Sequence, residues 1–264
     1  MPVHFNSFVG KDKDESKLLS SIVTKNIEKS DEVFGSREKQ VFHATNYFID
    51  EKTKEKIGKI VITILGREKT NEIVDLDITL LSENAVELNF LEKLDKSSEA
   101  NEYYEVSTID DERHFQIETV NRYSLEQSDI ENTKQTVYLS LFPFQLNLYD
   151  NIKEFDKEFG FAEPIKVGET DMHVHGFAED MVAVGGLLSG NLDEPSSFVI
   201  GKVKDFADVI AVMGEVPVSF TIIRVDTAMG EIPVAASREQ FDLKELAAGK
   251  TICILADVKA DFKK

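Results

Sequence analysis

The segment Val218-Ser-Phe-Thr-Ile-Ile-Arg-Val225 alternates apolar and polar residues over most of its length, as a half-buried β-strand does. Asp226-Thr-Ala-Met-Gly230 follows it and reads as a turn. Apolar segments of the same kind recur through the last quarter of the chain, at residues 198–203, 218–225, 231–236 and 251–258. Their order along the chain predicts a small closed β-barrel.

A short helix is expected between the last two of these segments. Asp242 is a suitable N-cap, Glu245 stands three residues later in the capping-box position, and Gly249 follows the predicted end. The final strand contains Cys253, which we interpret as a small buried apolar residue. Because the chain has a single cysteine, no internal disulfide can form, and this indicates a reducing compartment.

Residues 198–262 resemble an OB-fold-type barrel. In such barrels a glycine lets the first strand coil from one sheet to the other, and a helix closes one end. The segments that carry the resemblance are Gly201-Lys-Val203, Phe220–Asp226, Gly230-Glu-Ile-Pro-Val234, the helix of residues 242–248 and Gly249-Lys-Thr-Ile-Cys-Ile254. Only four strands lie in this stretch, so a fifth has to come from upstream, and we expect it from Met172–Leu188.

The upstream part of the chain reads as an antiparallel meander with a few helices. Apolar residues spaced for one helix face occur at residues 14–27 and again at 152–159, where Gly160 provides a stop. The expected strands are residues 41–49, 59–65, 72–81, 103–108, 114–123 and 137–148, and residues 86–94 suit either a strand or a helix. The sequence thus predicts a mainly β chain with a few helices (α+β).

Chain length and linker signals predict two domains. A chain of 264 residues is long for one core, and Phe161-Ala-Glu-Pro164 reads as a linker. We therefore expect a helix and an antiparallel sheet in residues 1–163, and an OB-like barrel in residues 164–264.

Charge and hydropathy restrict the possible partners and location. The formal net charge of -19 opposes binding to a polyanion, so nucleic acid is not the expected partner. No apolar run approaches the roughly 18 residues that span a bilayer, and no signal peptide follows Met1. We expect a cytoplasmic protein that does not enter a membrane.

One group of residues has the composition of a metal site. Period-2 geometry would place Asp171, His173 and His175 on the same side of a strand, and Glu179 follows. His-x-His with a later Glu and with Gly186 resembles the first metal motif of the cupin barrels, which implies a metal-dependent enzyme. The alternative interpretation is a pair of exposed histidines on an edge strand.

A second group would suit single-stranded nucleic acid. OB-type barrels bind it through exposed aromatic side chains above a basic groove. Here the candidates are Phe220, Arg224, Lys202, Lys204 and Arg238, with Phe220 also suited to the core.

The leading hypothesis is a non-catalytic binding or interaction protein that acts through sheet faces and loops. A core pattern is well specified, whereas no set of reactive residues comes together in the sequence. The carboxylates of Asp75, Asp77 and Asp110–Glu112 are expected to be solvated. We expect the partner to be another protein or a second copy in a homodimer, and we expect no cofactor, with a divalent metal as the alternative.

Overall fold

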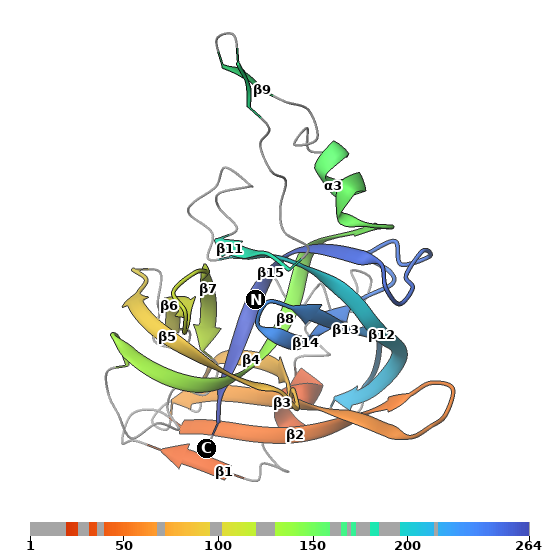
Figure 1. The fold of residues 1–264 in the computed structure, drawn as a ribbon. Coiled ribbons are helices and arrows are strands. Elements are labelled where there is room, and N and C mark those ends of the chain that lie inside the picture. Colours follow the sequence, from red (N-terminus) through yellow and green to blue (C-terminus); the bar gives the residue numbers. More distant parts are fainter. Residues whose placement is uncertain are drawn as a thin grey trace.

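The structure is a computed structural model, and it describes residues 20–25, 32–35, 40–67, 72–95, 102–119, 130–158, 165–167, 170–172, 180–184, 196–213 and 216–263. It confirms a mainly β chain with a few helices (Figure 1). The first strands are β1 (Glu32–Gly35), β2 (Gln40–Asp50), β3 (Lys56–Arg67), β4 (Glu72–Leu80), β5 (Ala85–Lys93), β6 (Glu102–Thr108), β7 (His114–Thr119) and β8 (Thr133–Tyr149). The later strands are β9 (Ile165–Val167), β10 (Thr170–Met172), β11 (Val182–Val184), β12 (Ser197–Met213), β13 (Val216–Thr227), β14 (Gly230–Ala236) and β15 (Thr251–Phe262).

Helices are few, as the sequence predicts. Residues 20–25 are helical, with Ile22 fully buried, and α3 (Ile152–Glu158) forms at the predicted place. The helix predicted at residues 242–248 is wrong, because these residues form successive turns. Asp242 does accept a hydrogen bond from the backbone N–H of Lys244 at 3.2 Å, so the capping signal is real although no helix follows it.

Four strands of the predicted barrel region and one strand from upstream close into a ring. β12 pairs with β13, β13 with β14, and β15 with β12, all antiparallel. The fifth strand is β8, which runs antiparallel to β15 and meets β14 in parallel at Leu141 opposite Val234. The expectation that Met172–Leu188 supplies this strand is therefore wrong. In the described part of that segment, β11 pairs with β12 outside the ring. The OB-fold resemblance itself stays a prediction.

A second ring repeats this plan upstream. β5, β6 and β7 form an antiparallel meander, β5 pairs with β8, and β7 meets β15 in parallel. Each ring thus consists of one three-stranded meander and the two long strands β8 and β15. Along the chain, β8 follows the β5–β7 meander and β15 follows the β12–β14 meander. The meanders also share a β-bulge in the first strand, after Phe90 in β5 and after Val203 in β12, and both residues lie in the same buried core.

The two rings share one sheet and one core. β8 and β15, which belong to both, pair from Thr251 opposite Tyr149 to Phe262 opposite Val137. The sheet therefore does not divide at the boundary predicted near residue 163, since β8 precedes that residue and β15 follows it.

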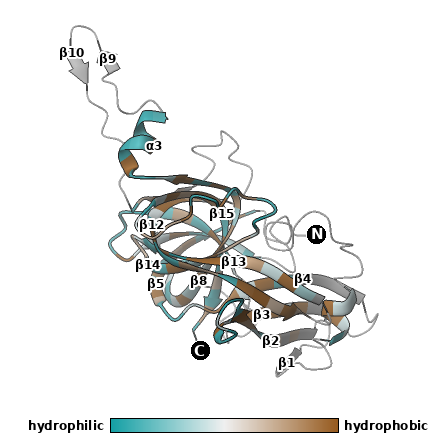
Figure 2. Cartoon of the chain, turned by 90° about the vertical axis from the view of Figure 1, so that its right-hand side faces the viewer, coloured by the Kyte–Doolittle hydropathy of each residue, from teal (hydrophilic) through white to brown (hydrophobic). Residues whose placement is uncertain are grey.

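A further meander of β2, β3 and β4 covers one side of the ring that contains β12, β13 and β14. β2 pairs with the far end of β12, where Asp50 lies opposite Val209, and the turn between β2 and β3 projects there (Figure 1). A second core fills the space between these strands and the ring, and in it the ring of Phe48 meets Phe220 edge-on at 5.8 Å. In contrast with these strands, α3 is mostly hydrophilic (Figure 2).

A third core lies under α3, and the buried residue Cys253 offers a test of its packing. The thiol is buried with Tyr149, Phe155 and Phe198, and burial, with a smaller contribution from the charge of Glu158, raises its pKa to about 12. At pH 8 only about one thiol in ten thousand would be ionised, and the thiolate is the reactive form. We expect no reaction of native protein with a disulfide reagent under conditions in which the urea-unfolded chain reacts fully. Rapid labelling of the native chain would contradict this packing.

Candidate binding groove

An open groove of about 900 Å³ lies between the β2–β3 hairpin and the outer face of β12, β13 and β14. We call it the hairpin groove, and its lining includes Tyr47, Lys56, Ile57, Lys59, Phe206 and Arg224. Tyr47, Ile57 and Phe206 are 46%, 43% and 39% exposed. These are three of the five large apolar side chains that are exposed in the described part of the chain, so apolar surface is concentrated here.

The backbone of the hairpin explains why Ile57 faces solvent. Phe48 lies opposite Gly58, but Ile49 lies opposite Lys56, so Ile57 is an extra residue in a β-bulge. A β-bulge interrupts the regular alternation of side chains between the two faces of a sheet, and here it leaves the side chain of Ile57 exposed. Gly58 lies beside it, and a Cβ at this position would overlap the ring of Phe48, so this buried ring would have to move.

Most charged groups along the groove are already satisfied by neighbours. Asp205 accepts a hydrogen bond from Arg224 Nε at 2.6 Å, and Glu231 pairs with Lys204. The hydrogen bond to Asp205, opposed by desolvation and supported by nearby carboxylates, raises the pKa of Arg224. Asp50 accepts hydrogen bonds from two backbone N–H groups of the hairpin turn, at 2.7 Å each, and the bond from Thr53 is the main cause that lowers its pKa.

Two lysines differ from the other cations of the groove. Lys56 Nζ lies 4.3 Å from the centre of the Tyr47 ring, and Lys59 Nζ lies 5.7 Å from it. Both side chains are exposed, and neither ammonium group makes an ion pair within the part of the chain that the structure describes. The wall of the groove around Tyr47 therefore presents positive charge next to apolar surface.

The residues proposed for nucleic acid lie in different settings. Phe220 is only 3% exposed and packs in the second core, whereas Lys202 is exposed on β12. Arg224 and Lys204 are held by the carboxylates of the groove, and Arg238 makes hydrogen bonds of 2.7 and 3.2 Å to Asp208. Burial would raise the pKa of Asp208, but the hydrogen bonds from Arg238 and Thr221 outweigh it and lower the pKa.

The predicted metal residues lie mostly outside the described residues. His173, His175 and Glu179 are among these, and for Asp171 the structure gives the backbone, which pairs with Lys166 in the β9–β10 hairpin. This metal site stays a prediction. Elsewhere, the described ranges contain no group of three or more His, Cys, Asp or Glu residues that could hold a metal ion.

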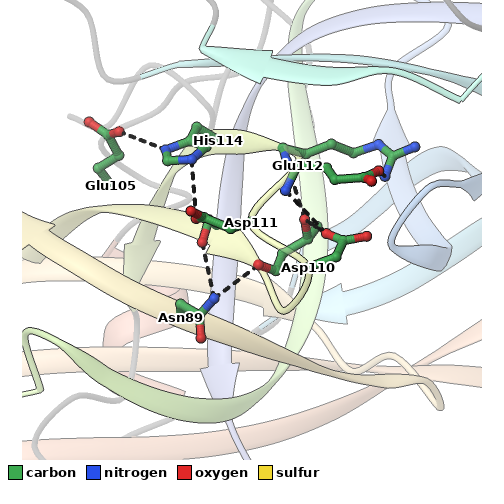
Figure 3. A network of polar contacts seen from close by, with 9 residues as sticks. Asn89, Glu105, Asp110, Asp111, Glu112 and His114 are labelled. Atoms are coloured by element: carbon green, nitrogen blue, oxygen red, sulfur yellow. Dashed lines mark hydrogen bonds and ion pairs between the residues drawn. The ribbon is translucent and has the colours of Figure 1, made fainter.

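The acidic turn between β6 and β7 is solvated, as predicted. Asp110 accepts a hydrogen bond from the Thr108 hydroxyl, and this bond chiefly lowers its pKa. His114 lies 3.3 Å from both Glu105 and Asp111 (Figure 3). These contacts hold the turn together, and we assign it no other role.

Asp77 is not solvated, which corrects the expectation from the sequence. It is buried, and its two carboxylate oxygens lie 3.1 and 3.3 Å from Lys259 Nζ. Glu118 of β7 is also buried and pairs with the same ammonium group, which is fully inaccessible to solvent. Desolvation opposes the charge on Lys259, but Asp77 and Glu118 outweigh it and raise the pKa.

Comparisons of the chain with protein-family models, curated proteins and solved structures find no match. Among the described helices, none has the length and apolar character needed to cross a bilayer. The groove is therefore interpreted from its own residues. Sequence patterns offer little sign of it, because Tyr47, Ile57 and Phe206 come from separate strands and none belongs to a motif.

Proposed function

We propose that this protein is a non-catalytic binding protein that takes up a segment of a partner protein in the hairpin groove. The observation that carries the proposal is the concentration of exposed apolar side chains there. Tyr47, Ile57 and Phe206 line one open groove, whereas the other two large exposed apolar residues of the described chain, Ile109 and Val212, do not. Exposed apolar surface of this kind, with a polar border, is typical of a protein-binding site.

The surroundings of these side chains support the same conclusion. Aromatic residues are enriched at the centres of protein interfaces, and polar groups form their borders. Here Tyr47 and Phe206 line the groove from β2 and β12, and the Arg224–Asp205 pair lies at its side. The walls are parts of one paired sheet, because β2 and β12 are hydrogen-bonded neighbours, so the site is preformed.

The proposal predicts which surface changes abolish binding. We expect Ile57→Ser combined with Phe206→Ser to weaken partner binding at least tenfold, because each apolar anchor contributes about 1–2 kcal/mol. The measurement is the recovery of protein partners from cell extract, quantified by mass spectrometry, with wild-type and variant protein immobilised at equal density.

Two matched controls make this test specific. Ile109→Ser removes a residue with 41% exposure, compared with 43% for Ile57, at the turn after β6. Val212→Ser removes an exposed apolar residue from β12, the strand that carries Phe206. Partners that are lost from the groove variant and kept by both controls would support the proposal. Equal recovery by all variants would contradict it.

A further inference from the structure

The charges around the hairpin groove restrict what it binds. On one wall, Asp205 and Glu231 are occupied by Arg224 and Lys204. Glu83, a third carboxylate of the lining, lies near enough to Arg224 to favour its charged form. This wall therefore carries three carboxylates against two cations, so it offers no attraction for an acidic group.

The opposite wall carries an excess of positive charge. Its only lining carboxylate within the described residues, Asp50, is engaged by the backbone N–H groups of the turn. Lys56 and Lys59 stand against the ring of Tyr47, and Lys59 is the cross-strand neighbour of Tyr47. A group that contacts these ammonium ions would lie directly beside Tyr47 and the bulged Ile57.

We infer that the bound segment carries carboxylate side chains next to a large apolar side chain. This inference rests on the proposed function and adds the chemical character of the partner. The carboxylates would pair with Lys56 and Lys59, and the apolar side chain would contact Ile57 and Phe206. Because the chain has a net charge of -19, these two local cations are what allow an acidic segment to approach this face.

Synthetic peptides test this directly. Three fluorescent peptides share the same spaced leucine and phenylalanine residues and differ in the residues between them, which are glutamate, glutamine or lysine. By fluorescence anisotropy, we expect the glutamate peptide to bind wild-type protein roughly tenfold more tightly than the glutamine peptide, with the lysine peptide weakest.

Substitutions then locate the effect. Lys56→Gln with Lys59→Gln should remove the preference for the glutamate peptide. Lys52→Gln with Lys54→Gln is the matched control, because it removes the same charge from the exposed turn of the same hairpin, outside the groove lining. Equal binding of the glutamate and glutamine peptides, a preference that survives in the Lys56/Lys59 variant, or no binding of any peptide would overturn the inference.

Partner recovery separates this inference from the proposed function. If recovery falls with Ile57→Ser and Phe206→Ser but is unchanged by Lys56→Gln and Lys59→Gln, the groove binds a partner whose chemistry differs from the one inferred. If recovery is indifferent to all of these substitutions, the proposed function fails as well.

Discussion

Replacement of Lys259 by methionine is expected to lower the free energy of unfolding by about 3–5 kcal/mol. The ammonium group is fully buried between the carboxylates of Asp77 and Glu118, which come from β4 and β7. Methionine has a similar volume but leaves both carboxylates in the interior without a cation. Their desolvation would then no longer be compensated, and this cost exceeds the loss of packing.

Urea unfolding of wild-type and variant protein measures this change. Lys263→Met is the control, because Lys263 is the neighbouring exposed lysine just beyond β15, and its substitution should change stability by less than about 0.5 kcal/mol. Combining Lys259→Met with Asp77→Asn and Glu118→Gln should recover part of the loss, since the buried negative charge is then removed. A Lys259→Met protein as stable as the Lys263→Met protein would refute this account of the cluster.

The pH dependence of this contribution follows from the same contacts. The pKa of Lys259 is raised above its ordinary value of 10.5, because the two carboxylates outweigh desolvation. A raised pKa on a basic group means that its stabilising contribution is fully present below the unfolded-state value and is lost as pH rises through the folded-state value. The contribution of the charged Lys259 to wild-type stability should therefore be constant through the neutral range. The Lys259→Met protein should lose less stability at lower pH, because its uncompensated buried carboxylates can then take up protons.

The buried cluster also shows what sequence patterns cannot reveal. Alternation places Asp75 and Asp77 on one face of β4, and a polar face ordinarily points to solvent. The partner that buries Asp77 is 182 positions away along the chain, on β15. Individual strands were predicted from local alternation, whereas the contacts that cover their polar faces depend on long-range pairing.

The same reasoning applies to ring closure. The strands of both meanders could be predicted, because each contains its own apolar pattern, but the closing strand β8 lies far upstream of β12–β14. The helix expected after Asp242 failed for a related reason. Tertiary contacts fix the backbone at the end of this segment, since Gly249 N donates to Val203 O at 2.7 Å and Val203 N donates to Lys250 O at 2.9 Å. A seven-residue helix has little intrinsic stability to compete with such contacts.

Gly201→Ala is expected to be the most damaging glycine substitution in the ring, with a loss of about 3 kcal/mol in unfolding free energy. Gly201 is the last residue of β12 that pairs with β15, and Lys202 is the first that pairs with β13. A Cβ at Gly201 would overlap the backbone carbonyl oxygen of Asp226 and lie 2.5 Å from a methyl carbon of Val225. Because the oxygen belongs to the paired β13 backbone, no change of rotamer can remove this overlap.

Gly230→Ala separates this crowding from backbone strain. Gly230 has a φ of +89°, but a Cβ at this position would have no neighbouring atom within 4 Å, so alanine there should cost only about 1–2 kcal/mol. The stabilities of the two variants are compared by the midpoints of their urea unfolding curves. This comparison holds when the slope of the unfolding free energy against urea concentration is the same for both. Adding Val225→Ala to Gly201→Ala should not restore stability, since the overlap with the carbonyl oxygen persists. A Gly201→Ala protein that is no less stable than Gly230→Ala would show that β12 can move away from β13 at this point, and the close approach would then not be needed to shape the ring.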